Sequence, residues 1–313
     1  MQIQSVRLTS RRRLLRSLAL VAATATALAC SSSSSSDPTN GTQTPGDVPP
    51  GNDPPAHGAD AGGDTGADAQ GAQPAPGGDL DEPHKKDIAM QLVSSAENSS
   101  LDWKAQYKYI EDIGDGRGYT AGIIGFCSGT GDMLELVENY QRLKPGNVLE
   151  KYLSALRKVN GTDSHAGLDP SFQGDWSTAA SDSAFQQAQN DERDAVYFNP
   201  AVQQAKQDGL GALGQFAYYD AIVMHGPGDS EDSFGGIRKT AMRHANTPTQ
   251  GGGEVAYLNA FLDARVAAMK TEEAHSDTTR VDTEQRVFLD NGNLDLHTPL
   301  AWKVYGESFR IDQ

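Results

Sequence analysis

Residues 83–97 read PHKKDIAMQLVSSAE and predict the helix around which the fold is organised. Pro83 stands at its start, where proline is tolerated because the first turn has no intrahelical partner for that N–H. One apolar stripe recurs at helical spacing and consists of Ile88, Ala89, Leu92, Val93 and Ala96. Glu97 continues this stripe four residues after Val93, so we expect a carboxylate on the inward face, which is unusual and marks a candidate functional residue.

A small sheet is predicted directly after this helix. Residues 114–118 read GDGRG, and residues 119–126 have the composition of a short strand. The flanking glycines are expected to leave the side chain of Asp115 exposed and close to a bound ligand. Asp-Gly is also the commonest hairpin-turn pair, and Glu97 near a helix end can simply reach solvent or pair with an arginine. Patterning alone therefore leaves both carboxylates open to a structural interpretation.

The rest of the chain is predicted to be mostly helical. Helical patterns cover residues 133–143, 148–159, 183–198, 201–224, 254–270 and 281–289, with proline and glycine between them. With one small sheet in the N-terminal third, the sequence predicts an α+β fold, mainly α-helical.

Residues 1–29 are predicted to be an export signal. Five arginines between residues 7 and 16 precede an apolar run, residues 18–28, that is too short for a permanent membrane span. The arginines resemble a twin-arginine signal. The run ends at Ala27-Leu28-Ala29-Cys30, which resembles a bacterial lipobox with Ala27 in place of a larger aliphatic residue. We expect lipidation of Cys30; the alternative is an ordinary signal peptide cleaved near this site.

Residues 30–80 are predicted to be a disordered tether. Six serines are followed by Pro, Gly, Ala, Asp, Thr and Asn with almost no large apolar side chains. Such a segment cannot bury enough surface to offset its loss of conformational entropy. Behind a lipid anchor it would hold a domain, residues 81–313, away from the membrane.

The predicted domain is acidic, with 21 Lys and Arg against 35 Asp and Glu. Such a surface attracts polycations and disfavours nucleic acid and anionic lipid, although solubility alone also accounts for it. Cys127 is the domain's single cysteine, so an internal disulfide is excluded, and its apolar neighbours indicate a buried hydrophobe. The sequence has no CxxC or HExxH pattern, and we expect no cofactor.

Two carboxyl groups in different environments suit glycoside hydrolysis. One must hold a proton to donate to the leaving oxygen, and the other must stay ionised to activate water or attack the sugar. The inward helix position suits Glu97 for the first role, since burial disfavours a charged carboxylate. The glycine-rich turn suits Asp115 for the second.

Five segments of the chain carry long motifs: LVSSAENSSLDW (residues 92–103), YIEDIGDGRGYT (109–120), QAQNDERD (187–194), GQFAYYDAI (214–222) and SFGGIR (233–238). In this order they resemble glycoside hydrolase family 46, the bacterial chitosanases. The resemblance extends over essentially residues 82–313. It implies a two-lobed, lysozyme-like fold with a small β-sheet lining the cleft, and endo-hydrolysis of the β-1,4 bonds of chitosan with inversion.

The resemblance also implies roles for single residues. Glu97 matches the general acid, Asp115 the general base that activates water, and Thr120 a residue that helps to hold that water. A charged network that supports Glu97 is matched by Arg280, Asp220 and Arg265.

Further positions match the substrate cleft. Asp132 corresponds to a carboxylate that binds a glucosamine ammonium group, and other cleft positions correspond to Arg117, Tyr109, His225 and Glu272. Ser276 stands where an acidic residue is expected, so one contact to a cation is missing. The expected partner is the polycation chitosan, and the expected protein is an exported monomer, extracellular or held at the cell surface through Cys30. The alternatives are an inactive cell-surface carbohydrate-binding protein and a chitinase-like or lysozyme-like hydrolase.

Overall fold

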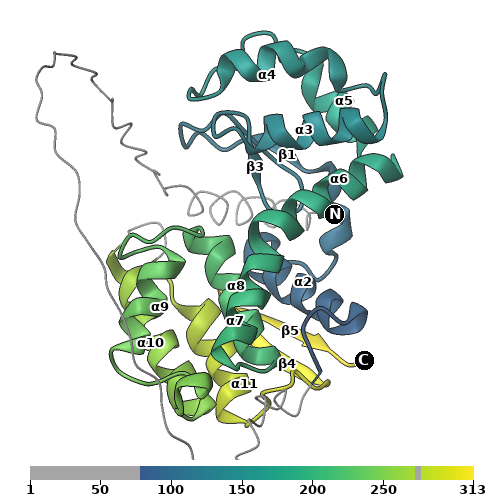
Figure 1. Ribbon diagram of the computed structural model, residues 1–313. Helices are drawn as coiled ribbons and strands as arrows, with labels where there is room; N and C mark the ends of the chain where they lie inside the picture. Colours follow the sequence, from purple (N-terminus) through teal and green to yellow (C-terminus); the bar gives the residue numbers. More distant parts are fainter. Residues whose placement is uncertain (1–77, 272–275) are drawn as a thin grey trace, which may run out of the picture. The chain divides into compact units, whose positions relative to one another are not determined.

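The computed structural model describes residues 78–271 and 276–313, which all belong to one compact unit (Figure 1). The predicted export signal, Cys30, nearly all of the predicted tether and Glu272 lie outside these residues. Within the two described ranges, no helix is both long and apolar enough to cross a membrane.

Helices dominate the described residues (Figure 1). The α-helices are α2 (Pro83–Asn98), α3 (Asp132–Leu143), α4 (Leu153–Val159), α5 (Phe172–Ala179), α6 (Ser183–Arg193), α7 (Asn199–Asp208), α8 (Ala212–His225), α9 (Phe234–Met242), α10 (Glu254–Thr271) and α11 (Arg286–Asp290). The 3-10 helices are η2 (Trp103–Lys108), η3 (Glu150–Tyr152) and η5 (Pro248–Gln250), and the π-helices are η4 (Asp194–Phe198) and η7 (Val281–Gln285). The strands are β1 (Ile110–Asp112), β2 (Tyr119–Ala121), β3 (Phe126–Cys127), β4 (Leu300–Val304) and β5 (Glu307–Ile311). The mainly helical α+β fold is therefore confirmed.

The expected helix over residues 201–224 is in fact two helices, α7 and α8. Gly209 ends α7 in a left-handed backbone conformation (φ 80°), and Gly211 has an extended conformation before α8 begins. A residue without a Cβ adopts the first conformation at little cost, which explains why the break falls there. The expected helix over residues 183–198 instead continues through η4 into α7.

Two small antiparallel sheets complete the fold. In the first, with order β1-β2-β3, Thr120 of β2 pairs with Glu111 on one side and Cys127 on the other. The second is the hairpin β4–β5, which the sequence patterns did not predict. Trp302 of β4 donates from Nε1 to Oγ of Ser95 at 3.0 Å, so this C-terminal hairpin is tied to α2.

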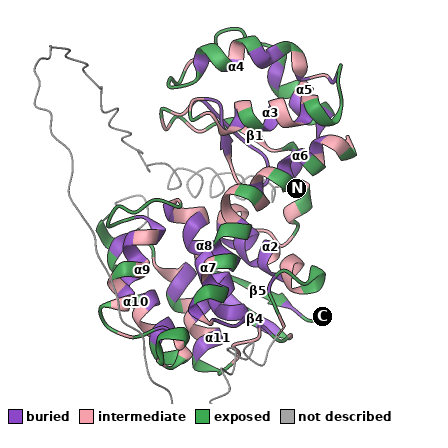
Figure 2. Cartoon of the chain, viewed as in Figure 1, coloured by how far each residue is buried: buried purple, intermediate pink, exposed green. Residues whose placement is uncertain are grey.

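Two hydrophobic cores divide the described residues (Figure 2). The first packs α2, α7, α8 and α10 together, with Phe216 and Phe261 fully buried. The second packs β1–β3 against α3, α4 and α5 around Trp176. The continuous helical run from α6 through η4 to α7 joins them, since Phe185 belongs to the second core and Phe198 to the first. This division gives the described residues two lobes.

The first core begins slightly before residue 81, where the sequence analysis placed the start of the domain. Leu80 is fully buried, and its N–H donates to Oε1 of Gln215 at 2.9 Å. Asp79 forms an ion pair with Lys206 of α7 at 3.1 Å. Because Leu80 fills space between helices distant in sequence, no local pattern indicated that it is part of the fold.

Candidate active site

Glu97 lies in the last turn of α2, whose predicted apolar stripe is buried in the first core. The helix ends at Asn98, and the next residue, Ser99, has a left-handed backbone (φ 49°) that turns the chain away. The side chain of Glu97 is 15 % exposed, and its Oε1 accepts a hydrogen bond from Nη1 of Arg280 at 2.5 Å. The sequence suggested apolar surroundings for this carboxyl group. Its main partner is instead an arginine, the alternative that the pattern left open.

Arg280 belongs to a buried charged network, and the structure brings the expected members together. Its guanidinium donates to Asp220 of α8 from Nε (2.8 Å) and Nη2 (2.5 Å). Nη1 of Arg265, on α10, lies 2.7 Å from Oδ2 of the same aspartate. Nε2 of Gln285 also donates to that oxygen at 2.7 Å. Asp220 therefore holds two arginines in place, and one of them reaches Glu97.

The electrostatics of this network keep Asp220 ionised. Burial by itself raises the pKa of Asp220, but the charges and hydrogen bonds of Arg280 and Arg265 lower it to about 2. A buried ion pair is not strong support for stability, yet removing one partner leaves an uncompensated charge and costs several kcal/mol, roughly 3–5. Asp220 and Arg265 thus fix the position of Arg280 beside Glu97, because removing either of them would leave a buried charge without its partner.

Asp115 lies in the loop between β1 and β2, where Gly114 and Gly116 have positive φ (72° and 85°). The sequence predicted an exposed side chain here, and this prediction is wrong: the side chain is 3 % exposed. Arg117 covers it, with Nε and Nη2 at 2.9 and 2.7 Å from Oδ2 and its backbone N–H at 3.0 Å from Oδ1. Glycine allows the loop to turn back sharply, so an arginine two residues away can hold the carboxylate.

Thr120 and Asp132 lie close to this loop around Cys127. Oγ1 of Thr120 is 3.5 Å from the Cys127 thiol. The N–H of Cys127 donates to the carboxylate of Asp132, at the start of α3, at 3.0 Å, and Oγ1 of Thr130 donates to it at 2.5 Å. Burial raises the pKa of Asp132, and these hydrogen bonds oppose the rise. Burial also raises the pKa of the Cys127 thiol, as expected for a small buried hydrophobe.

Tyr109 faces the same loop from the end of η2. Burial raises the pKa of its hydroxyl to about 12, and the nearby carboxylates of Glu111 and Asp115 add to the rise. One lobe thus carries Asp115, Thr120, Asp132 and Tyr109, and the helix α2 of the other carries Glu97.

Two carboxyl groups, each in contact with an arginine, occur in a fold that matches a known family of hydrolases. Residues 91–300 match the model described as Glycosyl hydrolase family 46. The chain belongs to this family. The family resemblance seen in the sequence is thereby confirmed.

Similar proteins and solved structures support this assignment. The chitosanase of Streptomyces sp. (strain N174) is 75 % identical over 236 residues, which is 75 % of this chain and 85 % of the relative. A co-crystal structure of a chitosanase with substrate shares 62 % identity and a TM-score of 0.72, covering 75 % of this chain and 99 % of that one. A Gynuella sunshinyii chitosanase in complex with chitotetraose shares 34 % identity and a TM-score of 0.66, covering 73 % and 97 %.

Sequence reasoning missed several groups that lie beside the candidate site. Tyr305, in the β4–β5 turn, faces the Arg280–Glu97 pair; burial raises its pKa to about 12, with Arg280 opposing and Glu97 adding to the rise. Gln285 and Glu284 lie in η7 beside Asp220. No local signal marks these residues, because they approach Glu97 only after α2, η7 and the C-terminal hairpin have packed together.

Three further residues that the resemblance relates to the cleft are His225, Glu272 and Ser276. His225 ends α8 and is 3 % exposed. Glu272 lies outside the described residues, and Ser276 is the first described residue after that gap.

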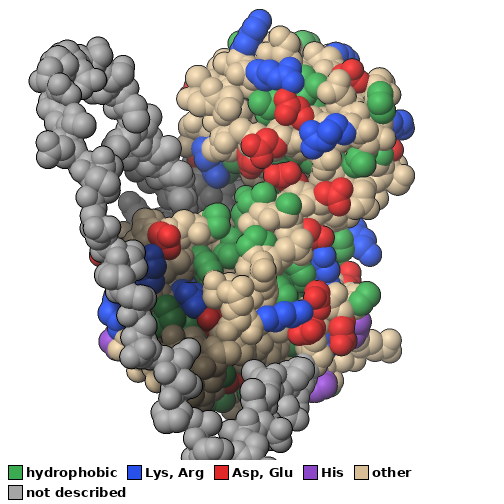
Figure 3. Space-filling view, viewed as in Figure 1, with side chains coloured by type: hydrophobic (Ala, Val, Ile, Leu, Met, Phe, Trp, Pro, Cys, Tyr) green, Lys and Arg blue, Asp and Glu red, His purple; other side chains and the backbone are tan. Residues whose placement is uncertain are grey.

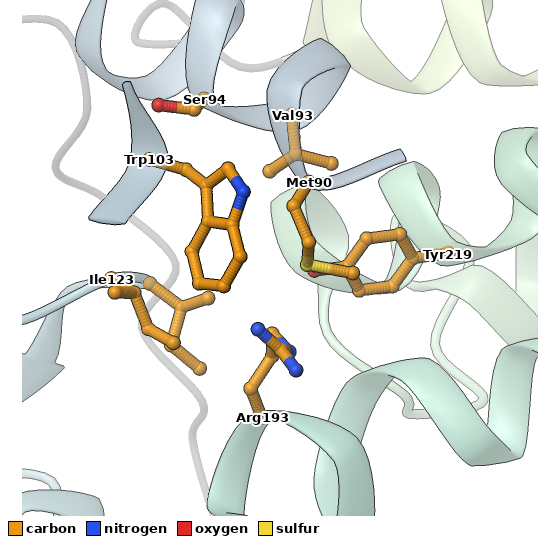
Figure 4. Close-up of a pocket in the computed structure, with 8 residues that line it drawn as sticks. Met90, Val93, Ser94, Trp103, Ile123, Arg193 and Tyr219 are labelled. Carbon is orange, nitrogen blue, oxygen red and sulfur yellow. The ribbon is translucent and has the colours of Figure 1, made fainter. Parts of the chain in front are cut away.

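A small cavity lies between α2 and the β2–β3 turn (Figure 4). It is lined by Met90, Val93, Ser94, Trp103, Ile123, Ile124, Arg193 and Tyr219. Its volume of about 10 Å³ suffices for roughly one water molecule. A sugar unit does not fit there, so this cavity is not a substrate site.

Proposed function

We propose that this protein is an endo-acting chitosanase that cleaves β-1,4 bonds between glucosamine units with inversion. The observation that carries the proposal is the 2.5 Å contact between Arg280 and Glu97 in a family 46 chain, which the buried Asp220 and Arg265 hold in place. Glu97, at the end of α2, is the first of the two carboxyl groups, and the buried charged network holds its partner Arg280 in place. Asp115, in a separate loop of the other lobe, supplies the second.

In the proposed mechanism Glu97 gives its proton to the glycosidic oxygen as the bond from that oxygen to the anomeric carbon breaks. Asp115 takes a proton from a water molecule whose oxygen attacks the opposite face of the sugar, and Thr120 helps to hold that water. Inverting enzymes keep their carboxyl groups about 6.5–9.5 Å apart to admit this water. A β-linked substrate then gives an α-anomer as its first product.

The charge of the protein supports a polycationic substrate. The whole chain has a net charge of -16, and acidic side chains lie among basic ones on the face seen in Figure 3. Asp132 is a carboxylate beside the loop of Asp115 and is suited to bind an ammonium group. We therefore assign glucosamine polymers, with their protonated amines, as the substrate class.

An exported, monomeric enzyme anchored through Cys30 is part of the same proposal. It is supported by the arginine-rich start, the short apolar run and the lipobox-like end of residues 1–30. Expressing the full chain in a bacterial host with radiolabelled palmitate tests it, with Cys30→Ala as the control. Label on both proteins, or on neither, would contradict lipidation at Cys30. Size-exclusion chromatography with light scattering tests the monomer.

The decisive experiment follows glucosamine hexamer by NMR in the presence of the purified protein. Shorter oligomers that appear first as α-anomers support an inverting endo-chitosanase, whereas first products as β-anomers would exclude inversion. Binding of the hexamer without cleavage favours the inactive carbohydrate-binding alternative. Faster cleavage of the fully acetylated hexamer favours the chitinase-like or lysozyme-like alternative.

A further inference from the structure

Glu284 is a carboxyl group buried inside the charged network behind Glu97. It lies in the π-helix η7, four residues after Arg280, and is 1 % exposed. Three charged groups from three different segments face it: Asp220 of α8, Arg265 of α10 and Arg280. The proposed mechanism gives Glu284 no role. A glutamate side chain is nevertheless almost never fully buried unless it is paired with another group.

Within the described part of the chain, Glu284 lacks the hydrogen bonds that a buried, ionised carboxylate needs. Among the described residues neither of its carboxyl oxygens has a hydrogen-bond partner, and the same is true of Nε of the neighbouring Arg265. Asp220, an ionised carboxylate in the same network, accepts hydrogen bonds from Arg280 and Gln285. An ionised Glu284 would need comparable bonds to offset its desolvation. Burial raises the pKa of Glu284 well above its usual range and Asp220 raises it further, while Arg280 and Arg265 oppose the rise.

We propose that Glu284 is a positioning residue that stays protonated and thereby leaves one positive charge of the network available to Glu97. With Glu284 neutral, two arginines face one aspartate, which leaves the network with one net positive charge beside Glu97. That charge stabilises the carboxylate left on Glu97 after it has given its proton away. An ionised Glu284 would cancel the charge and make the donation harder. This inference rests on the proposed role of Glu97 as the acid.

The protonation of Glu284 is tested by equilibrium unfolding of the full chain and of Glu284→Gln between pH 5 and pH 8. A proton held only in the folded state is released on unfolding. The unfolding constant of the wild type, divided by that of the variant, should therefore rise about tenfold per pH unit above the usual glutamate pKa. Glu307→Gln, at an exposed position of β5, is the matched control and should run parallel to the wild type. A constant ratio for Glu284→Gln would show that Glu284 is ionised in the fold and would overturn the proposal.

The effect on Glu97 is tested by a double-mutant cycle with Asp220→Asn, measured as kcat on glucosamine hexamer. Removing the charge of Asp220 favours ionisation of Glu284, which restores the network's single positive charge. Glutamine at position 284 cannot ionise, so two positive charges would remain, and Glu97 would lose its proton before the reaction.

In the wild-type background, Glu284→Gln should lower kcat by no more than about threefold, because glutamine keeps the neutral state and shape. In the Asp220→Asn background it should lower kcat by about tenfold or more. Equal factors in both backgrounds would leave Glu284 with a structural role alone and overturn the inference. The unfolding test does not depend on activity, so a failure of the proposed function, seen as an uncleaved hexamer, remains distinguishable from a failure of this inference.

Discussion

Arg117 holds the carboxylate of Asp115 from within the same loop. Two nitrogens of its guanidinium lie 2.9 and 2.7 Å from Oδ2, and its backbone N–H lies 3.0 Å from Oδ1. Because both carboxylate oxygens are engaged, the orientation of Asp115 is set before any substrate arrives. The sequence resemblance assigns Arg117 to substrate binding, whereas this contact indicates that it also orients Asp115, the proposed base.

Replacing Arg117 by lysine tests that second role. A lysine keeps the positive charge but cannot donate the pair of bonds from a planar group, so kcat should fall by about tenfold or more. Steady-state kinetics on glucosamine hexamer separate kcat from KM. A rise in KM at unchanged kcat would leave Arg117 as a substrate contact alone.

Glu97→Gln should nearly abolish turnover, by a factor of about 10²–10⁴, because an amide N–H is far too weakly acidic to protonate the leaving oxygen. Glutamine preserves the shape of the side chain, so calorimetric binding of glucosamine hexamer should stay largely intact. If the variant's turnover stayed within a factor of about ten of the wild type, Glu97 would not be the general acid.

Asp115→Asn should also nearly abolish turnover, since the amide cannot take a proton from water. Azide needs no base, and its addition should restore cleavage and give a glycosyl azide with α configuration. A β-configured azide would instead indicate attack from the other face and rule out Asp115 as the base of an inverting reaction.

The lowered pKa of Asp220 predicts that the folded protein loses stability in acid. The pKa of this aspartate is about 2 in the fold against an ordinary 3.8. A lowered pKa means that its contribution is present above about pH 4 and is lost as the pH falls toward 2, by about 2 kcal/mol. Urea unfolding of the wild type and of Asp220→Asn between pH 2 and pH 5 measures this. The difference between the two free energies should shrink over that window; a constant difference would contradict the assignment.

The burial of Leu80 predicts that this residue is part of the folded domain. Truncating this buried side chain to alanine should lower the free energy of unfolding by about 3 kcal/mol, because it removes apolar contacts and leaves a cavity. Deleting residues 31–77 should leave the melting temperature unchanged, as expected for a tether. Calorimetry compares the two changes, and a large fall on deletion would show that the tether packs on the domain.

Local sequence patterns predicted the parts of this fold that depend on neighbouring residues. The stripe of α2 follows from a helical repeat of 3.6 residues, so the buried face and the turn that carries Glu97 were foreseen. The turn at Asp115 follows from Gly114 and Gly116, whose backbones adopt positive φ. The family resemblance also named Arg280, Asp220 and Arg265, which the structure brings together.

Only the tertiary structure decided what surrounds each carboxyl group. Glu97 meets Arg280 across 183 residues of sequence, and Asp115 is covered by an arginine where an exposed side chain was predicted. Glu284 enters the network only because its helix, η7, contacts α8 and α10, where Gln285 bonds to Asp220 and Arg265. The charge state of a buried group depends on desolvation and on charges that packing brings near, and no spacing along the chain contains that information.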